Sequence, residues 1–136
     1  MALIITRDEA GTDEVQFNGA GTPIQKTVTL DGAGGTVLTD TKIFYLQANG
    51  GMYYENIVLA LQGEVAGRDW ELSLDGTTWL NTIEPADMDT TSEPQTTTFY
   101  IRCTVTNDGG NDQPGTGTYT EVDVRLTATE LESAPT

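Results

Sequence analysis

The sequence predicts an all-β protein, built as a sandwich of antiparallel strands. Residues 96–107 and 121–129 alternate apolar and polar side chains, which is the period of a strand with one buried face. The chain has 24 Thr against 3 Ser, together with 15 Gly. Thr suits the exposed face of a pleated sheet, and Gly suits tight turns. No window of helical length carries an apolar stripe without a break by Gly or Pro. A jelly-roll or a small β-barrel is an alternative that agrees with the same observations.

The first part of the chain divides into an arm and a series of strands. Residues 1–14 form the predicted N-terminal arm, a short apolar patch followed by a polar, acidic hinge. A strand is expected to start at 15–17 and another is expected over 24–30, whereas 36–48 form either one bent strand or two. The Asn-Gly-Gly at 49–51 is a strong turn signal.

Residues 52–67 contain the most apolar of the predicted strands. Ile57 and Leu59 share one face with Leu61, and Val58 lies with Ala60 on the other face. A strand that is apolar on both faces is usually central in its sheet or covered on its outer side.

Residues 68–80 predict a hairpin. Trp70, Leu72 and Leu74 share a phase, so the Trp70 ring is expected in the core. The Asp-Gly pair at 75–76 is the expected hairpin turn, and 77–79 begin the return strand.

Two predicted loops lie beside the two alternating strands of the C-terminal part. Residues 81–95 carry two prolines and no alternation, and 108–118 are rich in glycine. The domain organisation that we predict is a single sandwich domain over 15–130, preceded by the arm and followed by a tail at 131–136.

The chain is strongly acidic, with 21 Asp and Glu against 6 Lys and Arg and a net charge of −15. Nucleic acid and anionic membrane surfaces are therefore not expected as partners, because both would be repelled. The N-terminal apolar run spans only Ala2 to Ile5 and has no basic region, so neither a signal peptide nor a membrane span is expected.

The chain is short of groups that perform catalysis. It has no His, which is the commonest general base and metal ligand. Its three Ser lack an imidazole to activate them. Asp69 and Glu71 lie on the phase opposite Trp70 and are expected to face solvent. We therefore expect no enzyme and no cofactor. Cys103, the single Cys, lies on the apolar phase of its strand, which predicts a buried structural thiol.

Two loops hold oxygen donors of the kind that calcium prefers, although neither has the spacing of an EF-hand. The same residue types are also the usual turn formers, so a Ca²⁺ site and an ordinary turn remain alternatives at both places. The donors are Asn107, Asp108, Asn111 and Asp112 in one loop, and Glu84, Asp87 and Asp89 in the other.

Residues 100–128 resemble the last hairpin of immunoglobulin-like and fibronectin type III domains. They contain an aromatic residue, an alternating strand, a glycine-rich loop and a closing alternating strand. Trp70 is similar to the core Trp of those folds. The resemblance implies an immunoglobulin-like β-sandwich. The chain departs from it in having no partner for Cys103 and in having Ile101 where an antibody-type domain has Tyr.

The segment WELSLDGTTW, residues 70–79, resembles a pattern common in the β-rich structural proteins of tailed bacteriophages. With the missing export signal, the resemblance implies a non-catalytic virion protein that binds and stabilises the capsid lattice as a decoration or cement protein. Such a protein would be made in the host cytoplasm and would lie on the capsid surface. Its partners would be the major capsid protein and copies of itself, with a trimer expected. A phage tail or baseplate component is an alternative.

Four residues are candidate partner contacts: Leu3, Ile4, Ile5 and Trp79. The arm would either add a strand to a neighbour's sheet, with Leu3 and Ile5 in pockets, or form the first strand of the protein's own sheet. Trp79 is a candidate for core packing, for a protein interface or for a sugar-stacking surface. A carbohydrate-binding module that uses Tyr53 and Tyr54 beside Trp79 is a second functional alternative.

Overall fold

The computed structural model describes residues 3–15, 26–30, 36–63, 68–107, 115–119 and 122–135. The secondary structure in these ranges consists of ten strands, and every pairing between them is antiparallel. The all-β prediction is therefore confirmed. The strands are β1 (Leu3–Thr6), β2 (Lys26–Leu30), β3 (Thr36–Ala48), β4 (Tyr53–Gln62), β5 (Arg68–Ser73), β6 (Thr82–Ile83), β7 (Met88–Asp89), β8 (Gln95–Asn107), β9 (Gly115–Tyr119) and β10 (Asp123–Leu131). The described ranges contain no helix that could cross a membrane.

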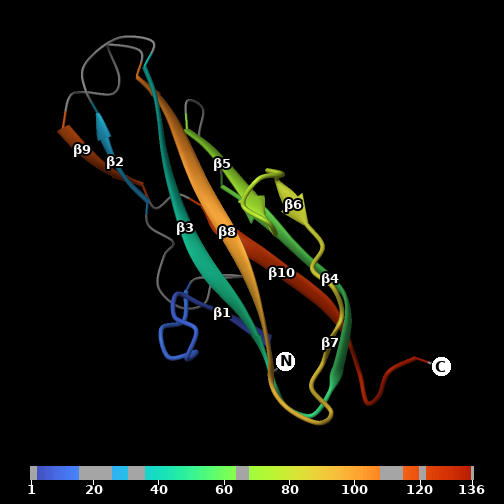
Figure 1. Ribbon diagram of the computed structural model, residues 1–136. Coiled ribbons are helices and arrows are strands. Elements are labelled where there is room, and N and C mark those ends of the chain that lie inside the picture. The colour runs from blue at the N-terminus through green and yellow to red at the C-terminus, as the bar shows by residue number, and fades with distance from the viewer. Residues whose placement is uncertain are drawn as a thin grey trace.

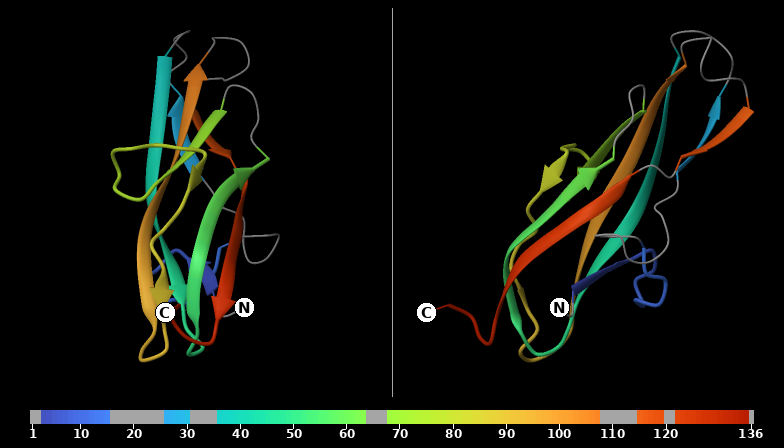
Figure 2. Two further views of the ribbon diagram at one scale, coloured as in Figure 1. Left: turned by 90° about the vertical axis from the view of Figure 1, so that its right-hand side faces the viewer. Right: turned by 180° about the vertical axis from the view of Figure 1, so that it is seen from behind.

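Two sheets face each other as the layers of a sandwich (Figure 1 and Figure 2). The first sheet has the strand order β1-β3-β8-β5, and the second has the order β10-β4-β6, with β7 also paired to β4. A two-stranded ribbon of β2 and β9 lies beside the end of the first sheet where β3 begins and β8 ends. The immunoglobulin-like strand arrangement stays a prediction.

The core lies between the two sheets and follows the predicted alternation. Phe44 of β3 pairs in register with Phe99 of β8, and their ring centroids are 6.0 Å apart. Trp70 and Cys103 are register partners, and both are buried, as predicted for each of them. The second sheet adds the buried side chains of Tyr54, Ile57, Leu59, Ile83, Met88, Val124 and Leu126.

A β-bulge changes the phase of β4. Asn56 has a φ of 52°, and the register with β10 shifts at this point. Ile57 and Leu59 therefore face the core after the bulge, and Tyr54 faces it before the bulge. The Tyr54 hydroxyl donates a hydrogen bond to the Asn49 carbonyl at 3.0 Å. The apolar face predicted for 57–61 is present, but plain alternation did not predict that Tyr54 is also buried.

Residues 3–6 form β1 at the edge of the first sheet, although we predicted them within an arm. Leu3 pairs with Ala48 and Ile5 with Leu46, and both Leu3 and Ile5 are buried in the chain's own core. The Val15 amide then donates to the Ile5 carbonyl at 2.9 Å. Of the two interpretations of this segment, the one in which it is the first strand of the protein's own sheet is confirmed.

A loop capped by Asp8 follows β1. The Asp8 carboxylate accepts the backbone N–H groups of Thr12 and Asp13, each at 2.9 Å, and also binds the Thr12 hydroxyl. These hydrogen bonds lower the pKa of Asp8 to about 2, with the Thr12 hydroxyl contributing most.

Three other sequence predictions are wrong. The predicted loop at 81–95 contains β6 and β7, which both pair with β4. Residues 115–118, predicted as loop, belong to β9 and pair with β2. The two alternating strands, β8 and β10, do not form a hairpin, because β8 pairs with β3 and β5 whereas β10 pairs with β4 in the other sheet. In each case the strand pairs with a strand that is distant in the sequence. The periodicity of apolar residues does not predict which strands pair, although buried backbone groups must be hydrogen-bonded.

Candidate functional site

The loop at 74–80 follows β5. It ends where Leu80 pairs with Leu72 through two backbone hydrogen bonds of 2.7 and 2.8 Å. The predicted return strand at 77–79 is not formed, because the loop continues to this pair. The buried Ser73 hydroxyl accepts the Gly76 N–H at 2.8 Å. Gly76 has a φ of 80°, and a Cβ there would lie 3.6 Å from the Tyr100 ring. The loop therefore packs against the outer face of β8.

Asp75 holds this loop together through its carboxylate. It accepts the N–H groups of Thr77 and Thr78, each at 2.8 Å, and the Ser73 hydroxyl at 2.9 Å. These donors hold the pKa of Asp75 well below its usual range, with the Thr78 and Thr77 amides contributing most. The carboxylate is thus ionised and fixed in place.

The loop places Trp79 over Arg102 of β8. The Arg102 guanidinium carbon lies 4.3 Å from the centroid of the Trp79 ring. Arg102 also donates from Nε and Nη2 to Glu71 Oε1, at 3.1 and 2.9 Å. Arg102 and Glu71 are register partners on neighbouring strands, so the sheet itself aligns them. Trp79 is half-buried on the outer face of the first sheet and does not lie in the core.

This contact belongs to a wider patch on the outer face of β3, β8 and β5. Tyr100 lies on the same face of β8 as Arg102, and its register partner on β3 is Ile43, whose exposed fraction is 47%. We call this set of side chains the aromatic patch. It consists of Ile43, Glu71, Trp79, Tyr100 and Arg102.

A groove opens at the edge of the sandwich, between β5 with its loop and β6. It has a volume of about 420 Å³. Leu74 and Leu80 line it and are 41% and 50% exposed, and the buried Ile83 is also part of its wall. The complete lining is Leu74, Asp75, Thr78, Leu80, Thr82, Ile83 and Glu84. We call this the β5–β6 groove.

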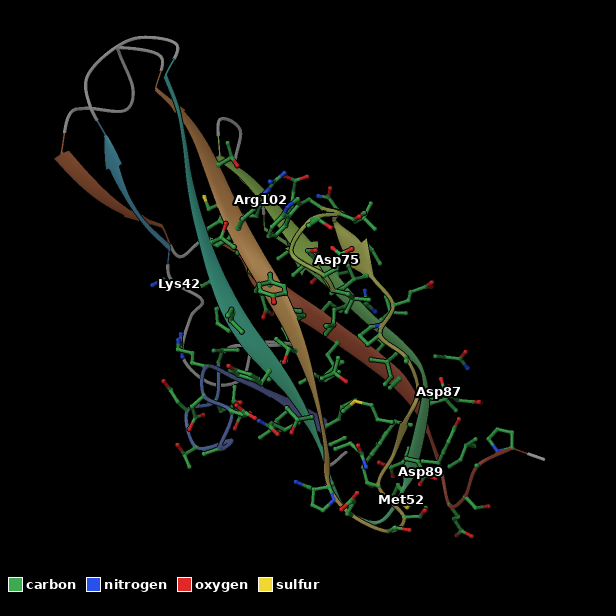
Figure 3. All side chains as sticks on the ribbon, in the orientation of Figure 1. Lys42, Met52, Asp75, Asp87, Asp89 and Arg102 are labelled. Carbon is green, nitrogen blue, oxygen red and sulfur yellow. The ribbon has the colours of Figure 1, made fainter. Side chains whose placement is uncertain are left out.

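The predicted sugar-stacking residues do not share a surface. Tyr54 is buried, and Tyr53 lies on β4 of the other sheet from the aromatic patch. The Tyr53 hydroxyl donates to Asp87 at 2.5 Å, which raises its pKa to about 12. Figure 3 shows Asp87 beside β4 and well separated from Arg102.

Two of the predicted calcium donors, Asp87 and Asp89, are engaged with their neighbours, and Glu84 lines the β5–β6 groove. Asp87 accepts from Tyr53, and Asp89 accepts the hydroxyl and the N–H of Thr91, which lower the pKa of Asp89, with the hydroxyl contributing most. Within the described ranges, no group of three or more His, Cys, Asp or Glu is arranged to hold a metal ion. The 108–112 loop and the Asp69 side chain lie outside the described residues.

The four predicted contact residues are not brought together. Leu3 and Ile5 are in the core, Ile4 is half-buried on β1, and Trp79 lies over β8. Sequence reasoning missed Arg102 and the β5–β6 groove. Leu74 and Leu80 on either side of the Asp-Gly turn were a signal for the groove. The pairing of Arg102 with Glu71 could not be predicted, because it depends on the register between two strands that are distant in the sequence.

No family model matches the chain, and neither a curated protein nor a solved structure matches it.

Proposed function

We propose that this chain is a non-catalytic structural protein that attaches to another protein through the aromatic patch. The contact between Trp79 and Arg102 is the observation that carries the proposal. Trp, Tyr and Arg are the residues that most often dominate the energy of protein interfaces. An aromatic side chain on a loop usually loses conformational entropy when a partner binds. Here Arg102 and the Asp75 turn order Trp79 beforehand, so that cost is reduced.

The setting that we propose is the surface of a bacteriophage capsid, where the chain acts as a decoration or cement protein. Support comes from the pattern at 70–79, because its residues build the loop that presents Trp79. Ser73 and Asp75 close the turn, and Gly76 adopts the positive φ. The resemblance to phage structural proteins therefore falls on the residues that shape the patch.

The proposed mechanism is adhesion. Copies of the chain, proposed as trimers, bury apolar surface of the patch against the major capsid protein, which contributes about 25 cal/mol per Å² of apolar area removed from water. Many such contacts across subunit seams would stabilise the shell. The net charge of −15 keeps decorated particles from associating with each other.

The carbohydrate-binding alternative is not supported by the geometry, because Tyr54 is buried and Tyr53 lies on the other sheet from Trp79. A tail or baseplate location would use the same patch, and no contact in the structure favours it over the capsid.

The test begins with purified particles of the source virus, in which mass spectrometry measures the copy number of the chain relative to the major coat protein. Particles stripped of the chain are then incubated with recombinant protein. We expect wild type and the control Tyr53→Ala to rebind, and Trp79→Ala to bind about tenfold more weakly. Absence of the chain from particles would overturn the virion setting, and equal rebinding by Trp79→Ala would overturn the role of the patch.

A further inference from the structure

We propose that the β5–β6 groove binds an extended segment of a partner protein that carries an apolar side chain next to a Lys or Arg. The inference rests on the proposed function, because it takes the chain to act by binding protein, and it adds the chemistry of the segment that is bound. The groove is separate from the aromatic patch, since the two share no residue.

The apolar part of the proposal follows from Leu74 and Leu80. Three large apolar side chains are exposed in the described part of the chain, and two of them are these leucines of the groove. With Ile83 they surround a volume of about 420 Å³, which lies within the range of ligand pockets. Apolar surface concentrated in a hollow marks a binding site more often than isolated apolar residues do. An aliphatic side chain of a partner would remove both leucines from water.

The basic part of the proposal follows from the charges around the groove. Its two charged lining residues, Asp75 and Glu84, are both acidic. Asp75 is kept ionised by the amide groups of its turn. The cations with described side chains are Arg7, Lys42, Arg102 and Arg125, and none of them lines the groove.

Arg102, the cation of the adjoining aromatic patch, is already engaged by Glu71 and Trp79. A partner cation is therefore attracted to the rim without competition from another cation among the described side chains. An acidic segment is repelled, both by the rim and by the net charge of −15.

The extended form follows from the position of the groove. It lies between the loop at 74–80, which follows β5, and β6 at the edge of the second sheet (Figure 1). A slot between a loop and an edge strand accepts a single chain segment more readily than a folded domain.

The test uses the full chain and three fluorescein-labelled peptides of about nine residues, with binding measured by fluorescence anisotropy. One peptide alternates Leu and Lys, the second alternates Leu and Glu, and the third alternates Ser and Lys. We expect the Leu/Lys peptide to bind at least about tenfold more tightly than either of the others. The Ser/Lys peptide is the control for general attraction to an acidic protein, and equal binding of the two Lys peptides would overturn the proposal.

Two pairs of variants locate the binding. The double variant Leu74→Thr/Leu80→Thr should weaken binding of the Leu/Lys peptide about tenfold, whereas Leu131→Thr, a half-buried apolar site on β10 outside both the groove and the aromatic patch, should not. Glu84→Gln should weaken binding and reduce its dependence on salt, whereas Glu132→Gln in the exposed C-terminal segment should not. Peptide binding that survives the leucine substitutions would overturn the proposal.

The same double variant separates this inference from the proposed function. If stripped particles rebind Leu74→Thr/Leu80→Thr as well as wild type, the groove inference fails and the capsid role stands. If the peptide binds in the groove but the chain is absent from particles, the capsid role fails and the groove inference stands.

Discussion

The Arg102 guanidinium lies 4.3 Å from the centroid of the Trp79 ring while it donates two hydrogen bonds to one oxygen of Glu71. The arrangement joins three segments: β5 through Glu71, β8 through Arg102, and the β5–β6 loop through Trp79. A planar guanidinium can stack on a ring and donate along its edge at the same time, which an ammonium cannot. The identity of Arg102 therefore matters beyond its charge.

Arg102→Lys should release Trp79 from its fixed position. We expect the free energy of unfolding to fall by about 1 kcal/mol, from the weaker cation–π contact and the lost second hydrogen bond. Acrylamide should quench the tryptophan fluorescence of this variant more strongly than that of wild type. Arg125→Lys, on the exposed face of β10, is the control. Unchanged quenching in Arg102→Lys would show that the stack does not hold the ring.

Trp70→Phe should be tolerated far better than Trp70→Ala. Trp70 is fully buried, and its indole N–H has no hydrogen-bond acceptor in the described part of the structure. Phe keeps most of the apolar contact and removes a buried donor, so a cost of about 1.5 kcal/mol or less is expected. Ala leaves a cavity and should cost about 3–5 kcal/mol. Urea denaturation measures both values, and equal costs would contradict a purely apolar role.

Ile5→Ala should destabilise the protein by about 2–5 kcal/mol, because Ile5 is buried opposite Leu46 in the core. Ile4→Ala is the matched control on the half-buried face of β1, with an expected cost of about 1 kcal/mol or less. Thermal unfolding compares the two variants. An Ile5→Ala protein with wild-type stability but weakened assembly would show that β1 serves as a docking arm.

Asn56→Val should cost about 1–2 kcal/mol, because a β-branched residue is strained at the φ of 52° that the β4 bulge requires. Asn56→Gly should be close to neutral, since Gly adopts this conformation readily. Equal stability of the two variants in urea would indicate that the bulge is not maintained in solution.

Tyr53 should ionise at a higher pH than a free tyrosine does. Its hydrogen bond to the Asp87 carboxylate raises its pKa from 10.0 in the unfolded chain to about 12. Because the pKa is raised on folding, this contact stabilises the protein fully below pH 10 and is lost as the pH rises through 12. Absorbance titration at alkaline pH should show a late tyrosine that titrates earlier in Asp87→Asn. A Glu9→Gln control should leave the titration unchanged, and an Asp87→Asn curve identical to that of wild type would rule out this assignment.

The sequence by itself determined which side chains of β8 are buried. Phe99, Ile101 and Cys103 alternate with polar residues, and all three lie in the core, as does Trp70. The turn at 49–51 was also predictable from its own residues. Gly50 and Gly51 adopt positive φ values of 96° and 75°, which Gly tolerates readily. These features depend only on neighbouring residues and on the period of a strand.

Only the tertiary structure decided which strands lie side by side. Alternation records that one face of a strand is buried and not which edge it pairs with, so the separation of β8 and β10 into different sheets was not predictable. The bulge at Asn56 and the place of β1 in the sheet likewise could not be predicted from alternation. The stack of Arg102 on Trp79 and the leucines of the β5–β6 groove exist because backbone pairing over long sequence distances brings those side chains together.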